Sequence, residues 1–144
     1  MKPLYKGLIL AGVQIALVAS LGGKYLLDRA TRPRVWVKTR AGDRAMPVRG
    51  RYVNLWLDAG MQMVPESGTA PDAREMRLRP AEPRFSLYPN EPVAFFIPER
   101  VPDPSQRVAG EELWVEVTIP KKGPPRPIRL GVKKGDTLTL LDLR

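Results

Sequence analysis

The side chains that most often carry out covalent catalysis or hold transition metals are missing from this sequence, which contains no histidine and no cysteine. A Ser-His-Asp triad, a thiol nucleophile, a Cys/His zinc site and a disulfide are therefore excluded. The sequence also contains no Gly-rich phosphate-binding loop. We therefore expect a protein that is not an enzyme and that needs no cofactor or metal.

The carboxylates that lie closest together in the sequence do not form a catalytic pair. Glu111 and Glu112 are adjacent, so on a strand they point to opposite faces. Glu116 shares a face with Glu112 and with Trp114, where the expected role is a cross-strand ion pair. Glu99, which follows a proline, is either a capping or salt-bridging carboxylate or a functional acid.

The densest local signal is an Arg-Gly-Arg-Tyr run at the start of an alternating segment. In a structural interpretation Gly50 forms the turn, Tyr52 packs and hydrogen-bonds, and Leu55 enters the core. In a functional interpretation Arg49, Arg51 and Tyr52 receive an acidic group, because guanidinium groups pair well with carboxylates and phosphates. The sequence leaves both interpretations open.

A long apolar segment covers residues 7–23, which are 17 residues without a charge between Lys6 and Lys24. As a helix it would be roughly 25 Å long, at the lower end for crossing a bilayer. Tyr5 and Tyr25 lie where interfacial aromatic residues are expected. We predict an uncleaved signal-anchor; a cleaved signal peptide and a buried core helix are the alternatives.

The net charge of +9 suggests a polyanion ligand until it is divided along the chain. Residues 1–34 carry six basic residues and one acidic residue, whereas residues 35–144 carry 18 and 14. Most of the excess surrounds the apolar segment, so we expect no nucleic-acid binding. Read literally, the positive-inside rule places the C-terminal side in the cytoplasm, but it weakens when a whole domain follows. We favour a single-pass protein of the bacterial inner membrane with its domain on the periplasmic side.

Two lysine pairs, Lys121–Lys122 and Lys133–Lys134, stand in segments that read as loops. We interpret both pairs as lying at the same end of a meander of hairpins. Solvated loops are one explanation for these charges. Contact with anionic lipid or with an acidic partner is the other.

The part of the chain after the apolar segment predicts β structure, because most of its 16 prolines lie beyond residue 32 and exclude long helices. Period-2 alternation and turn residues predict strands at 35–38, 51–57, 92–98, 113–119, 128–132 and 137–143. Segment 92–98 reads as buried on both faces, with Phe95 and Phe96 in the core. Segment 113–119 reads as buried on one face, with Trp114 outside. Residues 59–84 read as a long loop in which 74–79 can pair as an edge strand.

The expected architecture is mainly β. Residues 1–33 form a single N-terminal transmembrane helix with a basic connector. Residues 34–144 form a small antiparallel β barrel or sandwich, an extracytoplasmic domain with the long loop around 59–84.

Two segments of the chain resemble the GDYXXLXY family of small bacterial membrane-anchored proteins. The matching positions of the first motif are Arg49, Gly50, Tyr52 and Leu55. The later run VAFFIPE, ending at Glu99, is similar to the family's aromatic-aromatic-Val-Pro-Glu element. The Asp of the name motif is Arg51 here, and its last Tyr is Leu57. Over roughly residues 1–100, the resemblance implies a membrane anchor and a polytopic membrane-protein partner, and no mechanism.

Taken together, these patterns predict a non-catalytic bitopic membrane protein that serves as an accessory or interaction subunit of a larger envelope membrane complex. Its partners would be the lipid bilayer and a polytopic membrane protein. The alternative is an extracytoplasmic ligand-binding module that receives an anionic small molecule or glycan through Arg49, Arg51 and Tyr52.

Overall fold

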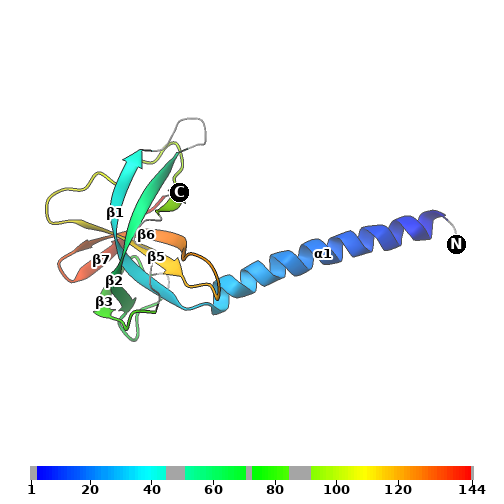
Figure 1. Ribbon diagram of the computed structural model, residues 1–144, viewed down its shortest axis with the longest axis horizontal. Helices are drawn as coiled ribbons and strands as arrows, with labels where there is room; N and C mark the ends of the chain where they lie inside the picture. Colours follow the sequence, from blue (N-terminus) through cyan, green and yellow to red (C-terminus); the bar gives the residue numbers. More distant parts are fainter. Residues whose placement is uncertain (1–2, 45–50, 71–72, 85–91, 144) are drawn as a thin grey trace. The chain divides into compact units, whose positions relative to one another are not determined.

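A computed structural model of the chain describes residues 3–44, 51–70, 73–84 and 92–143, with only the backbone described for residues 41–44. The chain divides into two compact units, Met1–Arg32 and Pro33–Arg144. The first unit is helical and the second is built from strands (Figure 1).

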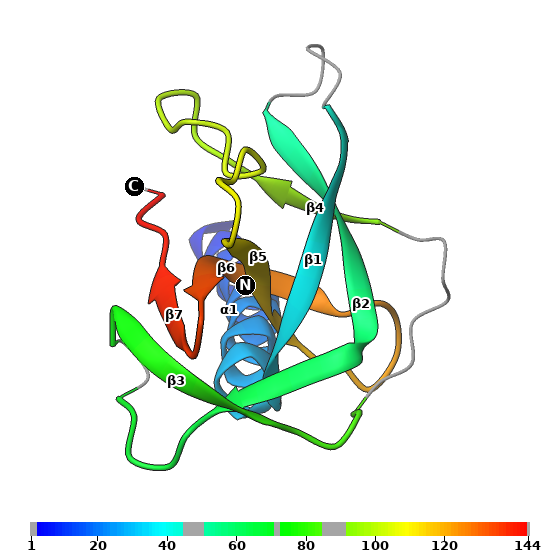
Figure 2. The same ribbon diagram turned by 90° about the vertical axis from the view of Figure 1, so that its left-hand side faces the viewer.

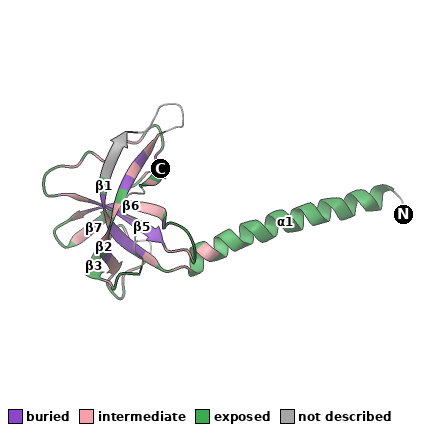
Figure 3. Ribbon diagram, in the orientation of Figure 1, coloured by how far each residue is buried: buried purple, intermediate pink, exposed green. Residues whose placement is uncertain are grey.

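The helix α1 covers Pro3–Thr31 and buries none of its residues. Its large apolar side chains each expose between 52% and 74% of their surface, and Figure 3 shows the helix as exposed almost throughout. An ion pair between Asp28 and Arg32 at 3.0 Å closes its last turn. The buried-core-helix alternative is therefore wrong. The helix is long and apolar enough to cross a membrane, and a signal sequence would have the same properties.

The second unit is one antiparallel sheet of seven strands, which confirms the expected fold class. The strands are β1 (Arg34–Arg44), β2 (Tyr52–Pro65), β3 (Glu75–Pro80), β4 (Val93–Phe96), β5 (Glu112–Thr118), β6 (Arg126–Lys134) and β7 (Thr137–Leu140). Their order is β1-β5-β6-β7-β3-β2-β4, and β1 also pairs with β2. This last pairing closes a ring to which β4 is attached through β2 (Figure 2). The ring is not a regular barrel, because β1 and β2 pair with large register shifts.

The largest register shift produces a bend in β2. Val37 pairs with Gln62, whereas Thr39 pairs with Leu57, so residues 58–61 have no partners on β1. The Asp58 carboxylate accepts a hydrogen bond from the backbone N–H of Gly60 at 3.1 Å and holds this bend locally.

Gln62 fixes the same bend from the inside of the protein, where its side chain is 3% exposed. Its amide nitrogen donates to the carbonyl of Ala59 at 2.9 Å, and its amide oxygen accepts from the N–H of Arg84 at 2.8 Å. Its backbone carbonyl accepts from the N–H of Ala81 at 2.9 Å. One side chain therefore joins the bend to the segment that follows β3.

Two apolar clusters fill the domain, one on each face of β5. The larger cluster consists of Val35, Val37, Val53, Leu55, Ile97, Leu113, Val115, Val117 and Leu130. The smaller cluster consists of Trp36, Met76, Trp114 and Leu138. The expectation that β5 exposes one face is therefore wrong: Trp114, Glu116 and Thr118 are buried as well, and β5 is coloured as buried in Figure 3. Side chains from other strands therefore cover both faces of β5.

Two other sequence expectations also fail. The strand expected at 92–98 is the four-residue β4 at one end of the strand order, and Phe96 is 69% exposed rather than in the core. Phe95 is partly buried against the larger cluster. The expected loop at 59–84 contains the second half of β2 and all of β3, and β3 lies between β7 and β2 rather than at an edge.

Candidate functional site

The candidate residues of β2 meet β4 through a short antiparallel ladder. Tyr52 pairs with Phe96 and Asn54 pairs with Ala94. The N–H of Ile97 donates to the carbonyl of Arg51 at 3.0 Å and extends the ladder by one residue. Since successive side chains on a strand alternate between faces, Tyr52, Asn54 and Phe96 share one face of this ladder.

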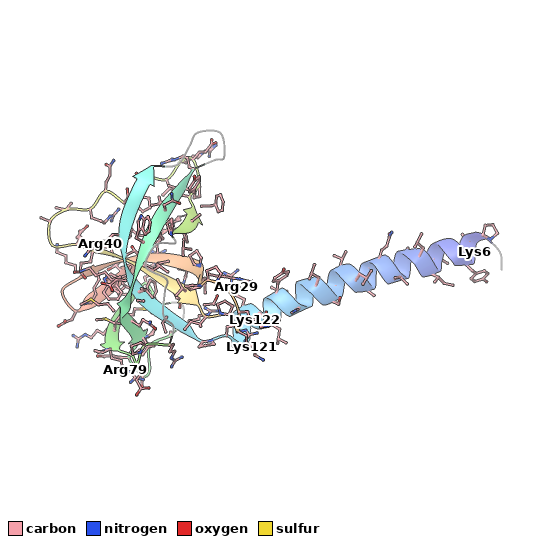
Figure 4. All side chains as sticks on the ribbon, in the orientation of Figure 1. Lys6, Arg29, Arg40, Arg79, Lys121 and Lys122 are labelled. Atoms are coloured by element: carbon pink, nitrogen blue, oxygen red, sulfur yellow. The ribbon has the colours of Figure 1, made fainter. Side chains whose placement is uncertain are left out.

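We call the side chains of Tyr52, Trp56 and Phe96 the aromatic face. The rings of Tyr52 and Phe96 are 5.9 Å apart and inclined by 56°, a tilted arrangement that aromatic pairs favour. Phe96 is 69% exposed and Trp56 is 39% exposed. Trp56 stands opposite Arg40 on β1, which is exposed and labelled in Figure 4. Exposed aromatic side chains that share one face of a sheet are typical of surfaces that bind another protein.

Arg51 joins β2 to the segment after β4. Its guanidinium donates a hydrogen bond to the backbone carbonyl of Glu99, 48 residues later in the chain. The side chain of Glu99 is exposed, and none of the ion pairs found among the described residues includes it. Arg51 is thus engaged within the domain through at least one of its N–H groups.

The structure brings together three of the residues singled out from the sequence and separates others from them. Arg51, Tyr52 and Glu99 lie at the junction of β2 and β4. Leu55 is 0% exposed and belongs to the larger apolar cluster, in agreement with its structural interpretation. Arg49 and Gly50 lie outside the described residues.

The carboxylates of β5 are each engaged by a cation. Glu116 pairs across the strands with Arg129 at 2.7 Å, which confirms the expected cross-strand ion pair. Glu112 pairs with Lys38 at 2.5 Å and also accepts a hydrogen bond from the indole N–H of Trp114 at 3.2 Å. Both carboxylates of β5 are thus held by ion pairs that join neighbouring strands.

The pKa of the Glu112 carboxyl lies below its ordinary value of 4.5, chiefly because Lys38 donates a hydrogen bond to it. Partial burial acts in the opposite direction, while the hydrogen bond from Trp114 and the positive charges of Lys38 and Lys133 lower the pKa further.

Sequence reasoning missed that basic side chains cover the two buried tryptophans. The guanidinium of Arg129 lies 6.0 Å from the ring centre of Trp36, and the amine of Lys133 lies 5.5 Å from that of Trp114. The indole N–H of Trp36 is buried and has no hydrogen-bond partner among the residues that the structure describes. A pattern in the sequence could have predicted these contacts between tryptophans and charged side chains. Aromatic and charged residues alternate at every second position on two paired strands: Trp36 and Lys38 on β1, and Glu112, Trp114 and Glu116 on β5.

The two lysine pairs lie at opposite ends of β6, so their expected placement at one end is wrong. Lys121 and Lys122 are exposed in the loop before β6, whereas Lys133 and Lys134 are its last two residues. The reversal after them is completed by Gly135 with φ of 61°, a conformation that favours glycine.

Within the parts of the chain that the structure describes, no group of three or more acidic, histidine or cysteine side chains could hold a metal ion. Comparisons with family models, with curated proteins and with solved structures find no significant match to this chain. A function is therefore inferred from the chain's own residues.

Proposed function

We propose that this chain is a non-catalytic, single-pass protein of the bacterial inner membrane, whose periplasmic domain docks on a larger membrane complex as an accessory subunit. The observation that carries the proposal is the aromatic face, exposed on a domain that is tethered to a long apolar helix.

The length and exposure of α1 support the membrane part of the proposal. Its 29 residues would extend about 43 Å, more than the roughly 30 Å of a bilayer's hydrocarbon core. Its exposed apolar side chains find no cover in the described chain, and lipid would cover them. We infer an uncleaved signal-anchor, with the N-terminus in the cytoplasm.

The aromatic face supports the docking part of the proposal. Phe96 lies on β4, which pairs only with β2 among the described strands. Aromatic residues are enriched where proteins bind one another, and the edge of a sheet can receive a partner's strand. A membrane-tethered domain meets other membrane proteins most often, so we propose a polytopic membrane protein as the partner. The resemblance to the GDYXXLXY family supports the same kind of partner.

The ligand-binding alternative depends on Arg49, Arg51 and Tyr52 receiving an anion. The hydrogen bond from Arg51 to the carbonyl of Glu99 favours the structural role of Arg51 instead. The ring of Tyr52 packs on Phe96. Docking through the aromatic face is therefore our preferred function.

Site-directed photocrosslinking in membranes tests the proposal. A benzophenone amino acid replaces Phe96 in the full-length protein, expressed at its native level, and the crosslinked product is identified by mass spectrometry. We expect one dominant adduct with a polytopic membrane protein. A matched probe at Val108, which is 73% exposed and lies outside the aromatic face, should give no such adduct.

The substitutions Phe96→Asp and Val108→Asp test how strongly each position contributes to partner binding. Truncating or charging a central aromatic residue of an interface typically reduces binding by about 30-fold or more. We therefore expect Phe96→Asp to abolish co-purification of the crosslinked partner and Val108→Asp to preserve it. Recovery of the chain alone, or equal adducts from both probe positions, would contradict the docking function.

A further inference from the structure

The place where the chain enters the β domain lies beside the loop between β5 and β6. The carbonyl of Pro33, the first residue of the second unit, accepts a hydrogen bond from the N–H of Ile119 at 3.1 Å. Arg34 pairs with Thr118, and Thr118 pairs in turn with Arg126. Residues 119–125 therefore start next to the residues that follow the helix.

This end of the domain is basic. Segments 33–38 and 118–128 contain five basic residues and no acidic residue. Lys121 and Lys122 are exposed, and neither takes part in the ion pairs found among the described residues. Figure 4 shows both lysines at the end of the domain where β1 begins.

The loop that carries the two lysines has a restricted shape. Gly123 has φ of 93°, which other residues rarely adopt. Two prolines follow it, and the second of them, Pro125, is buried. The two prolines restrict the backbone that follows Lys121 and Lys122, which lowers the backbone entropy lost on binding.

Covalent connection alone keeps these lysines near the end of the helix. Pro33 lies two positions after Thr31 in the chain, and Lys121 lies two positions after Ile119. Consecutive Cα atoms are about 3.8 Å apart, and hydrogen-bonded strands are about 5 Å apart. The Cα atom of Lys121 is thus within about 20 Å of the last helical residue, for any direction of the helix.

The position of the helix end follows from the dimensions of a bilayer. The uncharged segment ends at Lys24, and the seven further residues to Thr31 extend about 10 Å. This is slightly more than the depth of a headgroup layer. A helix that crosses the membrane therefore ends at the headgroup surface. Membrane charge acts over about 8–10 Å in physiological salt, and long, exposed lysine side chains this close to the helix end can enter that region.

We propose that Lys121 and Lys122 bind the phosphate groups of anionic phospholipids and thereby hold the β domain against the membrane surface. This inference rests on the membrane-spanning part of the proposed function, but not on the docking partner. Two lysines at an anionic surface should favour the docked state of the domain by roughly 30-fold.

Headgroup quenching of a fluorophore tests this proposal on the full-length protein in lipid nanodiscs. Because the chain has no cysteine, single labels can be placed at Pro124→Cys, beside the lysine pair, and at Asp136→Cys, in the turn at the other end of β6. Lipids with a nitroxide on the headgroup quench the label. The nanodiscs contain either phosphatidylcholine alone or phosphatidylcholine with phosphatidylglycerol.

We expect phosphatidylglycerol to increase quenching at position 124 and not at 136, and about 0.5 M NaCl to remove the increase by screening. The double substitution Lys121→Gln/Lys122→Gln should abolish the increase. The matched double substitution Lys133→Gln/Lys134→Gln removes the same charge at the distant end of β6 and should preserve it.

Two results would overturn the proposal. The first is that quenching at position 124 does not change when phosphatidylglycerol is added, or that the increase in quenching persists in Lys121→Gln/Lys122→Gln. Either outcome would show that the lysines do not recognise anionic lipid. Failure of the chain to insert into nanodiscs would overturn it together with the membrane-spanning part of the proposed function. Loss of the Phe96 crosslink alone would leave the lipid contact intact, so the two failures are distinguishable.

Discussion

Trp114 on β5 stands directly opposite Gly131 on β6, and the absence of a side chain at Gly131 is what leaves room for Leu138 in the smaller apolar cluster. A Cβ atom on Gly131 would lie 3.1 Å from both Cγ and Cδ2 of Leu138 and 3.2 Å from the carbonyl of Thr139. The glycine thus allows β7 to pack closely against β6.

The first prediction concerns this close approach. Gly131→Ala should destabilise the domain by about 1–3 kcal/mol, the usual effect of overpacking a well-filled core. Thermal unfolding of the full-length protein, followed by tryptophan fluorescence, measures the loss. Gly60→Ala is the control, because its added Cβ would meet only the Asp58 carboxylate at an ordinary 3.4 Å. Equal stability of the two variants would show that the sheet relaxes freely around residue 131.

The second prediction concerns Gln62, which joins the bend of β2 to the segment after β3. Gln62→Leu should lower the free energy of unfolding by about 2–3 kcal/mol, because the carbonyl of Ala59 and the N–H of Arg84 lose their partner. Chemical denaturation provides the measurement. Gln106→Leu, at an exposed loop position, should leave stability within about 0.5 kcal/mol of the wild type.

The third prediction separates the structural and ligand-binding roles of Arg51. If its bond to the carbonyl of Glu99 fastens β4 to β2, Arg51→Gln should speed hydrogen exchange at the amide of Ile97 by about fivefold to tenfold. Arg40→Gln, an exposed arginine on β1, serves as the control and should leave that amide unchanged. Unchanged exchange in Arg51→Gln would instead favour the anion-binding role.

The fourth prediction concerns pH. The folded-state pKa of Glu112 is lowered, so its contribution to stability is complete above the ordinary carboxyl pKa of 4.5 and is lost as the pH falls through the lower folded-state pKa. Lys38→Met removes the largest cause of the shift and should flatten the acid side of the stability profile. Denaturation midpoints measured from about pH 7 to about pH 3 test this. Glu82→Gln, which alters an exposed carboxylate, should keep the wild-type slope.

The alternation of residues 51–57 predicted the faces of β2 correctly, because local pattern and tertiary packing agree there. Val53 and Leu55 are buried, and Trp56 on the other parity is partly exposed. The apolar run at 92–98 gave a wrong prediction, because local pattern and tertiary packing disagree there. A continuous apolar run reads as a doubly buried strand, but whether Phe96 is covered depends on which strand lies beyond β4, and that is decided far away in the sequence.

The candidate site was predictable only in part. The motif around Tyr52 pointed to β2. The contact of Tyr52 with Phe96, however, depends on the register between two strands, and the two residues are 44 positions apart in sequence. No local pattern encodes this register. The bend of β2 could not be predicted for a similar reason. It depends on hydrogen bonds that the side chain of Gln62 forms with Ala59, which precedes it, and with Arg84, which lies beyond β3.

The ring of strands also has a mechanical consequence. The domain's tether leads directly into β1, whose residue Trp36 pairs with Glu116 of β5 on one edge and with Met63 of β2 on the other. A force applied along β1 would therefore act in shear on the hydrogen bonds to β5 and to β2 at the same time. It would not open a single ladder one hydrogen bond after another. The start of β1 is therefore held to the sheet on both of its edges, so it should resist being peeled away from its point of attachment.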